Sequence, residues 1–373
     1  MVLPVLTHTV GRGEGRRADV CTRRVAAIIR RKMQAVLKPS PAAGFTVGEV
    51  AAPSPRPGEV LLRVSAASVC GTDVHLYDWD AWAQARVAPP RIVGHEVCGE
   101  VLAWGEGVRS PAIGTRVAVE SHIVCRHCEE CRRGDFHVCE NTRILGVDVD
   151  GGFATQVAVP AANVRPVAES VSSAVAAAME PVGNAVHACS YGDLDGRTVV
   201  VFGCGPIGCA AVAVARVLGA ARVIAVDRND YRLQLAERMG ASALVRANAA
   251  PVDREVLAAA GGDIDSVLEM SGSPVAVASA TRLVRPGGWI SLLGIGEPVT
   301  IDVTTDVVMK GLSLFGVVGR KLPETWDRTL AYVRDGVIDI APLITHTFPM
   351  HEINRAMELI KTGDCGKVTL TPE

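Results

Sequence analysis

Aromatic side chains are scarce in this 373-residue chain, where Phe, Trp and Tyr together make up 4% of the residues. Long hydrophobic runs are also missing, because no stretch approaches the roughly 18 uncharged apolar residues that a transmembrane helix needs. The formal net charge is only −2, so neither charge sign dominates the surface. Nucleic-acid and membrane-surface binders need a strong basic excess, and we therefore expect neither kind of partner.

A secretory signal is not apparent, since the start of the chain has neither an apolar core nor a cleavage site. Eleven cysteines are nevertheless present, and four of them crowd into residues 125–139. Clustered cysteines in a chain without a secretory signal are typical of metal ligands rather than of disulfides. We therefore expect a cytoplasmic protein with reduced thiols.

Residues 1–32 differ from the rest of the chain in charge. Only Glu14 and Asp19 oppose the basic residues of this segment, which are Arg12, Arg16, Arg17, Arg23, Arg24, Arg30, Arg31 and Lys32. The segment is either an Arg-rich targeting sequence or an extra leader ahead of Met33 as the natural first residue. Both interpretations predict that residues 1–32 are loosely ordered.

The hydrophobic content of 49% and the length suit two domains. From Met33 to about residue 178, short strand-like runs alternate with Gly and Pro clusters, which predicts a small β-barrel-like unit. From Arg197 onward, strands and helices alternate, which predicts a doubly wound parallel sheet. The expected elements there are Thr198–Phe202, Pro206–Leu218, Arg222–Val226, Tyr231–Met239, Ile264–Glu269, Pro274–Leu283 and Trp289–Leu293. Helical and strand-like stretches at 324–333 and 367–370 predict a return to the first unit.

A dinucleotide-binding turn is predicted where the strand Thr198–Phe202 meets the following helix. The motif Gly203-Cys204-Gly205-Pro206-Ile207-Gly208 has a strand before it and a helix after it. Its three glycines allow a tight turn, a close approach to the pyrophosphate, and close helix–strand packing. Asp227 ends the next strand, where a carboxylate binds the adenosine ribose and repels a 2′-phosphate. The motif therefore favours NAD over NADP.

Two zinc sites are predicted. Cys125, Cys128, Cys131 and Cys139 have the spacing of a closed tetrahedral site, which has no open position for a substrate and is therefore structural. The second site is less local. Residues 70–75 are expected at the end of a strand, and Cys70 in this stretch and His95 offer one thiolate and one imidazole. Glu96 or Glu180 completes this set, with one place left open for a substrate.

Taken together, these residues resemble the zinc-containing medium-chain alcohol dehydrogenase family, and within it the branch of L-threonine 3-dehydrogenases. The resemblance extends from Met33 to the C-terminus. The stretches that carry it are Cys70–Trp82, Gly94–Glu96, Glu120–Cys125, the four-cysteine segment, Glu180–His187, the glycine motif with Asp227, Leu293–Ile295, Gly316–Trp326 and Pro342–His346. It implies an α/β protein in which a Rossmann NAD-binding domain interrupts a GroES-like β-barrel catalytic domain. The implied ranges are 33–182 for the catalytic domain, with the structural zinc segment at about 121–142, then 183–318 for the Rossmann domain and 319–373 for the return.

The resemblance also implies roles for single residues. Cys70, His95 and Glu96 correspond to catalytic zinc ligands, Thr72 and His75 to a proton relay, and Glu180 to an acidic residue that assists both. The implied cofactor contacts are Gly203, Gly205, Ile207, Gly208, Asp227, Arg232, Leu293, Gly294, Ile295, Val317 and Val318. NAD, two zinc ions per chain, a small amino-acid substrate with a 3-hydroxyl, and a homotetramer follow as further expectations.

Simpler interpretations of several residues stay open. His75 can be a surface histidine, Thr72 can stabilise the turn after Gly71, and Glu180 can be an acid at a helix end. A polyol or diol dehydrogenase would share both zinc sites and NAD. A zinc module that binds nucleic acid is a remote alternative, because the chain has no patch of basic and aromatic residues.

Overall fold

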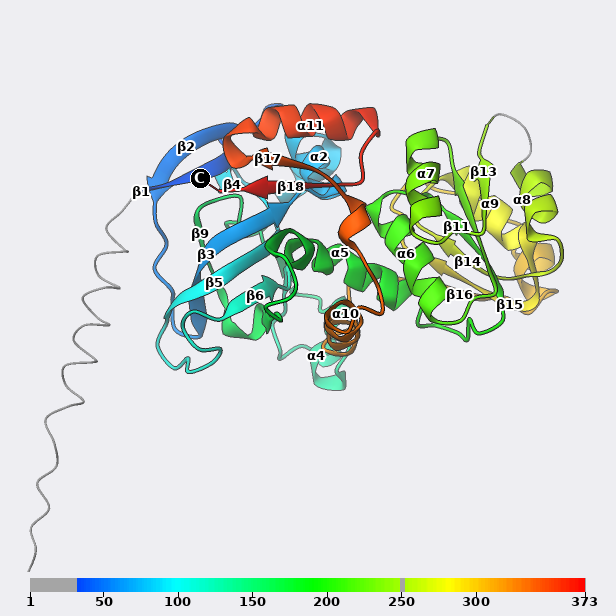
Figure 1. The fold of residues 1–373 in the computed structure, drawn as a ribbon, viewed down its shortest axis with the longest axis horizontal. Coiled ribbons are helices and arrows are strands. Elements are labelled where there is room, and N and C mark those ends of the chain that lie inside the picture. The colour runs from blue at the N-terminus through cyan, green and yellow to red at the C-terminus, as the bar shows by residue number, and fades with distance from the viewer. Residues whose placement is uncertain (1–31, 249–251, 373) are drawn as a thin grey trace, which may run out of the picture.

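The computed structural model describes residues 32–248 and 252–372 (Figure 1). The predicted leader therefore lies outside the described residues, except for Lys32. Lys32 was expected to be loosely ordered, but it begins the first strand and pairs with Ala51. Among the helices of the described ranges, none has both the length and the apolar character that crossing a bilayer requires.

Antiparallel strands dominate the first body of the molecule (Figure 1). Its strands are β1 (Lys32–Lys38), β2 (Thr46–Ala51), β3 (Glu59–Ser68), β4 (Arg91–Ile92), β5 (Glu96–Trp104), β6 (Arg116–Val119), β7 (His122–Ile123), β8 (Arg143–Ile144), β9 (Gln156–Pro160), β10 (Val164–Pro166), β17 (Ile344–Pro349) and β18 (Lys367–Thr371). The main sheet has the order β10-β6-β5-β3-β18-β17, with β9 also paired to β3. β18 pairs antiparallel with β3, so the last strand of the chain lies beside one of the first.

The second body is a six-stranded, wholly parallel sheet with the order β13-β12-β11-β14-β15-β16. Its strands are β11 (Thr198–Phe202), β12 (Arg222–Asp227), β13 (Ala243–Arg246), β14 (Ile264–Glu269), β15 (Val284–Leu292) and β16 (Ser313–Gly316). Its helices are α6 (Pro206–Val217), α7 (Asp230–Arg238), α8 (Val252–Ala260) and α9 (Pro274–Leu283). The strand order reverses direction at β11, which is the arrangement of a doubly wound dinucleotide-binding sheet.

Local chemistry explains where the helices of the second body begin. Pro206 and Pro274 each stand at the first turn of a helix, where a missing N–H costs nothing. Asn229 caps α7 through its side-chain oxygen, which accepts a hydrogen bond from the backbone N–H of Arg232 at 3.1 Å. Gly208 has to be glycine, because a Cβ there would lie 1.8 Å from the carbonyl oxygen of Gly203.

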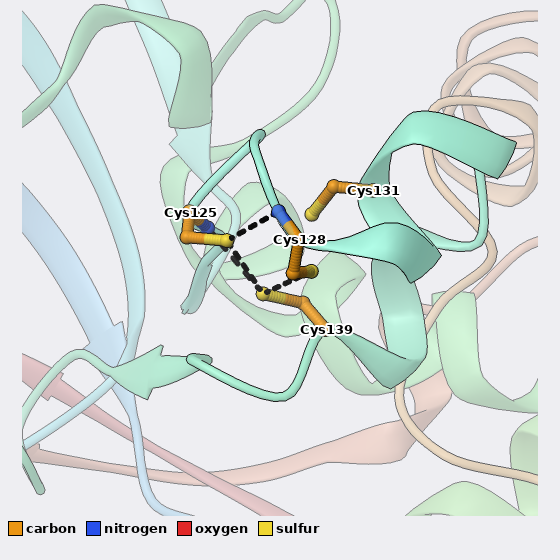
Figure 2. Close-up of side chains that lie close together, drawn as sticks. All are labelled: Cys125, Cys128, Cys131 and Cys139. Carbon is orange, nitrogen blue, oxygen red and sulfur yellow. Dashed lines mark hydrogen bonds between the residues drawn. The ribbon is translucent and has the colours of Figure 1, made fainter.

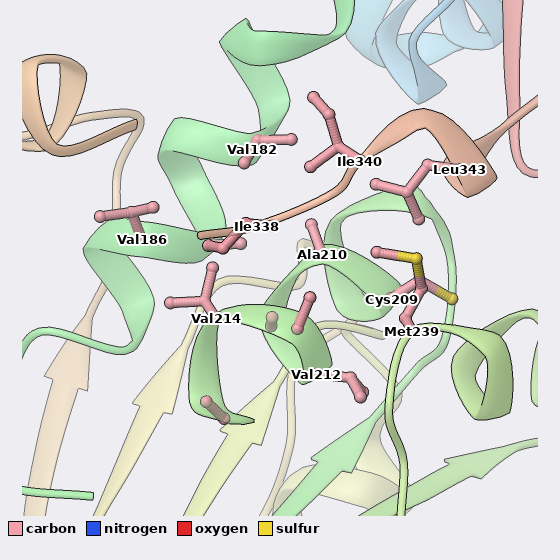
Figure 3. Packing of buried hydrophobic residues seen from close by; sticks show 14 of the residues in the cluster. Val182, Val186, Cys209, Ala210, Val212, Val214, Met239, Ile338, Ile340 and Leu343 are labelled. Atoms are coloured by element: carbon pink, nitrogen blue, oxygen red, sulfur yellow. The ribbon is translucent and has the colours of Figure 1, made fainter. Parts of the chain in front are cut away.

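The remaining helices belong to the first body or join the two bodies. They are α2 (Gly71–Asp78), α3 (Ala81–Arg86), α4 (Glu129–Arg133), α5 (Ser173–Ala188), α10 (Glu324–Arg334) and α11 (Ile353–Thr362). The boundary predicted between residues 182 and 183 falls inside α5. Figure 3 shows Val182 and Val186 of this helix beside Ile338 and above Val214 of α6, all within one buried hydrophobic cluster. α5 therefore joins the cores of the two bodies.

Candidate functional site

The four cysteines of the predicted structural site converge in one lobe around α4 (Figure 2). The Sγ atom of Cys139 lies 3.6 Å from that of Cys125 and 3.8 Å from that of Cys128. These distances match the edge of a ZnS₄ tetrahedron, which is about 3.8 Å for a Zn–S bond of about 2.3 Å, and far exceed a disulfide bond. The backbone N–H groups of His127 and, at 3.3 Å, of Cys128 donate to Cys125 Sγ, and these donors lower the pKa of the Cys125 thiol to about 6. The lobe therefore fits a zinc ion held by thiolates.

The predicted catalytic ligands also come together. Cys70 precedes α2, whereas His95 and Glu96 stand at the start of β5, and one ligand atom from each lies within 4.8 Å of the others. His95 is buried, which by itself lowers its imidazole pKa. The negative charges of Asp73 and Cys70 outweigh this effect and raise the pKa to about 10. Such a negative potential around a thiolate, an imidazole and a carboxylate is suited to a zinc cation.

Asp73 contributes to this site although the sequence analysis assigned it no role. Its Oδ2 accepts a hydrogen bond from the backbone N–H of Cys70 at 2.9 Å, and its Oδ1 lies 3.9 Å from His95 Nδ1. This carboxylate is fully buried at the first turn of α2. It thereby fixes the backbone at Cys70 and places a negative charge beside the imidazole of His95.

Glu96 has a second set of partners on the side of the main sheet. Lys367 Nζ donates to its Oε1 at 2.5 Å and also to its Oε2, and the Ser68 hydroxyl donates to the same Oε2. Lys367 is itself buried and donates to the carbonyl oxygen of Val69 at 2.9 Å. The carboxylate of Glu96 is thus shared between the ligand cluster and a lysine from the last strand. No local motif in the sequence indicates this pairing.

Glu180 lies near this cluster but is not part of the compact three-ligand set. Its carboxylate accepts a hydrogen bond from the Ser121 hydroxyl and forms an ion pair with Arg320 Nη1 at 2.9 Å. Its negative charge contributes to the raised pKa of His95, so the two side chains interact electrostatically. Glu180 therefore stays a predicted assisting residue, and the fourth zinc ligand stays open.

Arg320 is the centre of a buried polar network between the two bodies. Its guanidinium binds the Glu120 carboxylate through Nε, at 2.6 Å, and through Nη2. Its Nη1 donates to the side-chain oxygen of Asn184 at 2.9 Å, and Trp326 Nε1 donates to Glu120. Burial alone would raise the pKa of the Glu120 carboxyl, but Arg320 lowers it to about 2. The sequence analysis quoted the stretch Gly316–Trp326 but did not identify Arg320 as the partner of Glu120 and Glu180.

The predicted relay residues lie on α2, one turn apart. The Thr72 hydroxyl is 3.8 Å from Cys70 Sγ, next to the ligand cluster. The side chain of His75 is 55% exposed, and its Nδ1 lies 2.5 Å from Asp80 Oδ2. The sequence analysis expected these residues at the end of a strand, but Asp73 caps a helix here. The helix leads from the cluster towards solvent, which is the direction that a proton relay requires.

The dinucleotide motif forms the expected turn between β11 and α6. Gly203 has a φ of +86°, and a Cβ there would lie 2.7 Å from Ser271, so only glycine fits. Asp227 accepts hydrogen bonds from the backbone N–H of Cys204 at 2.7 Å and of Asn229 at 2.9 Å. A cavity of about 600 Å³ lies beside Asp227 and is also lined by Arg232. The turn and the cavity fit the pyrophosphate and adenosine parts of NAD.

The other predicted cofactor contacts follow the carboxyl ends of neighbouring strands. Leu293, Gly294 and Ile295 follow β15, and Ile295 is 96% exposed. Val317 and Val318 follow β16, where the N–H of Val317 donates to the carbonyl oxygen of Leu292 at 2.9 Å. Ile207 lies in the first turn of α6. The structure therefore brings all of these residues to one edge of the parallel sheet, and their contacts with a cofactor stay predictions.

Known proteins match this chain along nearly its whole length. The family model described as alcohol dehydrogenase GroES-like domain matches residues 56–169, and the one described as zinc-binding dehydrogenase matches residues 206–334. The L-threonine 3-dehydrogenase of Symbiobacterium thermophilum is 44% identical over 91% of this chain and 98% of its own. That of Bacillus subtilis is 45% identical over 91% of this chain and 99% of its own.

Solved structures agree with these sequence relatives. A short chain alcohol dehydrogenase from Escherichia coli CFT073, complexed with NADH, has a TM-score of 0.84 and 32% identity, covering 91% of this chain and 99% of its own. A zinc-binding dehydrogenase from Sinorhizobium meliloti, bound to NADP, has a TM-score of 0.84 and 30% identity, covering 92% and 100%. The 2R,3R-butanediol dehydrogenase from Bacillus subtilis has a TM-score of 0.82 and 26% identity, covering 91% and 100%.

These matches confirm the predicted fold class, a GroES-like domain combined with a Rossmann parallel sheet. They also confirm the predicted class of enzyme and its cofactors at the level of the family, which binds zinc and has members that hold nicotinamide dinucleotides. The identity of 44% over nine-tenths of the chain leaves no other family to consider. The chain belongs to the family of zinc-binding alcohol dehydrogenases, and L-threonine 3-dehydrogenases are among its relatives.

Proposed function

We propose that this protein oxidises L-threonine at its 3-hydroxyl to 2-amino-3-oxobutanoate and transfers the hydride to NAD. The observation that carries the proposal is the 41–46% identity to L-threonine 3-dehydrogenases from several bacteria and archaea. The alignments cover at least 90% of this chain and at least 98% of each relative, so both domains and both zinc sites are included.

The chemistry divides between the bound groups and the chain. When bound, zinc polarises the substrate hydroxyl as a Lewis acid and NAD accepts the hydride. Cys70, His95 and Glu96 would hold the metal, and Asp73 fixes the backbone at Cys70 and adds a negative charge beside His95. Because His95 and Glu96 are buried, they also exclude water from the reacting atoms, which strengthens every charge interaction there.

The chain itself has to remove the hydroxyl proton. The Thr72 hydroxyl lies 3.8 Å from Cys70 Sγ and can accept a proton and donate another by rotation. His75 is one helical turn further along α2, its side chain is 55% exposed, and its Nδ1 lies 2.5 Å from Asp80 Oδ2. An imidazole can take up a proton on one ring nitrogen and release one from the other, so His75 can pass the proton on to water. Glu180, fixed by Arg320 and Ser121, assists the metal and the relay.

A homotetramer in the cytoplasm is part of the proposal. The parallel sheet ends at β16, whose backbone edge is open among the described residues, and exposed apolar side chains lie beside it. Leu314 is 37% exposed, Val308 66% and Met309 76%. An open sheet edge with apolar neighbours supports pairing with a second copy of the chain. Sedimentation of the purified protein tests the number of copies.

The decisive experiment follows NADH formation with L-threonine, D-threonine, L-serine, sorbitol and 2,3-butanediol, in the presence of zinc and NAD. A clear preference for L-threonine is expected. A second candidate, a diol dehydrogenase, is favoured by the TM-score of 0.82 to 2R,3R-butanediol dehydrogenase. Turnover of 2,3-butanediol or sorbitol above that of L-threonine would establish the second candidate and overturn the first.

A further inference from the structure

Glu269, the last residue of β14, is a fully buried carboxylate inside the Rossmann sheet. Its Oε1 accepts hydrogen bonds from the backbone N–H of Ser271 at 2.9 Å and of Gly272 at 3.0 Å, and from the Ser271 hydroxyl. Its Oε2 is 3.1 Å from the same Gly272 nitrogen. All of these donors are neutral. Buried charges normally have a charged partner or a functional reason, so this carboxylate requires an explanation.

Glu269 holds the 271–273 loop, which packs against the Gly203 turn and the segment after β15 so closely that no side chain fits between them. A Cβ on Gly203 would lie 2.7 Å from Ser271, and a Cβ on Gly294 would lie 1.9 Å from the nitrogen of Gly272. The carbonyl oxygen of Glu269 also accepts the N–H of Leu293 at 2.9 Å and of Gly294 at 3.2 Å. A shift of the 271–273 loop would therefore move the dinucleotide turn and the segment after β15.

The strand order places this loop on one particular half of the cofactor site. β11 lies between β12 and β14, and a dinucleotide binds across the carboxyl ends of the strands with one nucleotide on each side of the reversal. Asp227 ends β12 and therefore belongs to the adenosine side. β14 and β15 lie on the opposite side, so Glu269, Ser271 and Leu293 belong to the nicotinamide side.

We propose that Glu269 is a positioning residue for the nicotinamide half of the dinucleotide, because its carboxylate holds the Ser271–Gly272 backbone against the Gly203 turn and the Leu293–Ile295 segment. The inference rests on the proposed use of NAD, but not on the identity of the alcohol. Burial raises the pKa of the Glu269 carboxyl, and the hydrogen bonds from Ser271 and Gly272 oppose this rise. Glu269 touches neither cofactor nor substrate in this proposal and acts through the loop alone.

The test compares two ligands in Glu269→Gln and wild type. NADH spans the whole cofactor site, whereas ADP-ribose has the adenosine and pyrophosphate groups but no nicotinamide. A Gln amide can keep an oxygen at the Oε1 position, but its NH₂ group then replaces Oε2, which lies 3.1 Å from the Gly272 nitrogen. Two donors would face each other there, so the Gly272 end of the loop should shift. We expect the Kd for NADH to rise about tenfold, which is about 1.4 kcal/mol. The Kd for ADP-ribose should change by less than about twofold, since the adenosine half lies on the other side of β11.

Val267→Ala is the matched control, since this residue lies on the same strand, is fully buried, and packs in a hydrophobic cluster of the Rossmann sheet. It should lower thermal stability and weaken the two ligands equally, if at all. An unchanged NADH affinity in Glu269→Gln, or an equal loss of both ligands, would overturn the positioning role.

A second variant keeps the test decisive if Glu269→Gln does not fold. Ser271→Ala deletes the hydroxyl that donates to the same carboxylate and accepts the backbone N–H of Ser273 at 3.1 Å, so it loosens the same loop. A selective loss of NADH affinity of about threefold is expected. The absence of a selective loss overturns the inference. The wild-type protein distinguishes failure of the proposed function from failure of this inference. If wild type does not bind NADH, the proposed function fails and this inference fails with it. If wild type binds NADH and the variants bind it equally well, only the role of Glu269 is refuted.

Discussion

The buried pair of Glu120 and Arg320 provides the sharpest prediction about stability. Both side chains are 1% exposed, and they join the first body to the loop that follows β16. In Glu120→Gln the size of the side chain is kept, but an NH₂ group faces guanidinium and indole donors. Removing one partner of a buried ion pair costs about 3–5 kcal/mol, because the other charge stays buried.

The expected loss is at the lower end of that range. Arg320 keeps Glu180 at 2.9 Å as a second carboxylate partner, and Asn184 at 2.9 Å as a further acceptor. We therefore expect Glu120→Gln to lower the free energy of unfolding by about 3 kcal/mol. For a chain of this length, such a loss corresponds to a fall in Tm of about 4 °C.

The pH dependence of the loss has a definite sign. The pKa of Glu120 is about 2 in the folded protein, against an ordinary value of 4.5. A pKa that is lower in the folded state contributes stability that is complete above the ordinary value and lost as the pH falls towards the folded value. The difference in Tm between wild type and Glu120→Gln should therefore be largest near neutral pH and shrink below pH 4.5. Comparing both proteins at each pH cancels any common loss of metal.

Thermal unfolding is monitored by tryptophan fluorescence, and Glu100→Gln is the matched control. Glu100 forms an ion pair with Arg63 at 2.6 Å, but the Arg63 side chain is 58% exposed. Such a surface pair contributes at most about 1 kcal/mol. A Glu120→Gln effect no larger than that of Glu100→Gln would refute the reasoning. A Tm difference that widens on acidification would refute the assigned direction of the pKa shift.

Three further predictions concern other parts of the structure. Gly183→Ala should lower the free energy of unfolding by about 1–3 kcal/mol, because the new Cβ would lie 2.7 Å from Arg320 Cδ. An unchanged Tm in thermal unfolding would mean that Arg320 can move away from α5 at no cost. Cys131→Ser should leave one zinc ion fewer per chain in metal analysis and lower the Tm, whereas unchanged zinc content would contradict a structural site in this lobe. His75→Ala should reduce kcat by about 100-fold at unchanged zinc content, and loss of zinc with a normal rate per zinc would exclude the relay role.

Elements with a strong local pattern could be predicted from the sequence. The strands β11 and β14 and the helix α9 have the predicted bounds, because an apolar run between turn residues can form little else. The four-cysteine spacing places all of its ligands within 15 residues, so the chain length alone brings them together. The glycine motif is local for the same reason, since strand, turn and helix are consecutive.

One prediction failed where a capping effect outweighed the local pattern. Residues 70–75 were expected at the end of a strand, but the Asp73 carboxylate accepts the N–H of Cys70 in the first turn of helix α2. The domain boundary between residues 182 and 183 stays a prediction; α5 spans it and buries apolar side chains in a cluster shared by both bodies. Neither effect can be recognised from hydrophobic periodicity alone.

The sequence by itself determined the ligand types, the glycine turn and the order of strands and helices, since each depends on residues that are neighbours in the chain. Only the tertiary structure decided which charges neutralise one another. Lys367 lies 271 residues from Glu96, and Arg320 lies 200 residues from Glu120. These pairs form because the last strand returns to β3 and the loop after β16 docks beside α5. The partner of a buried charge is the group that the fold brings close to it, and a local sequence pattern does not indicate which group that is.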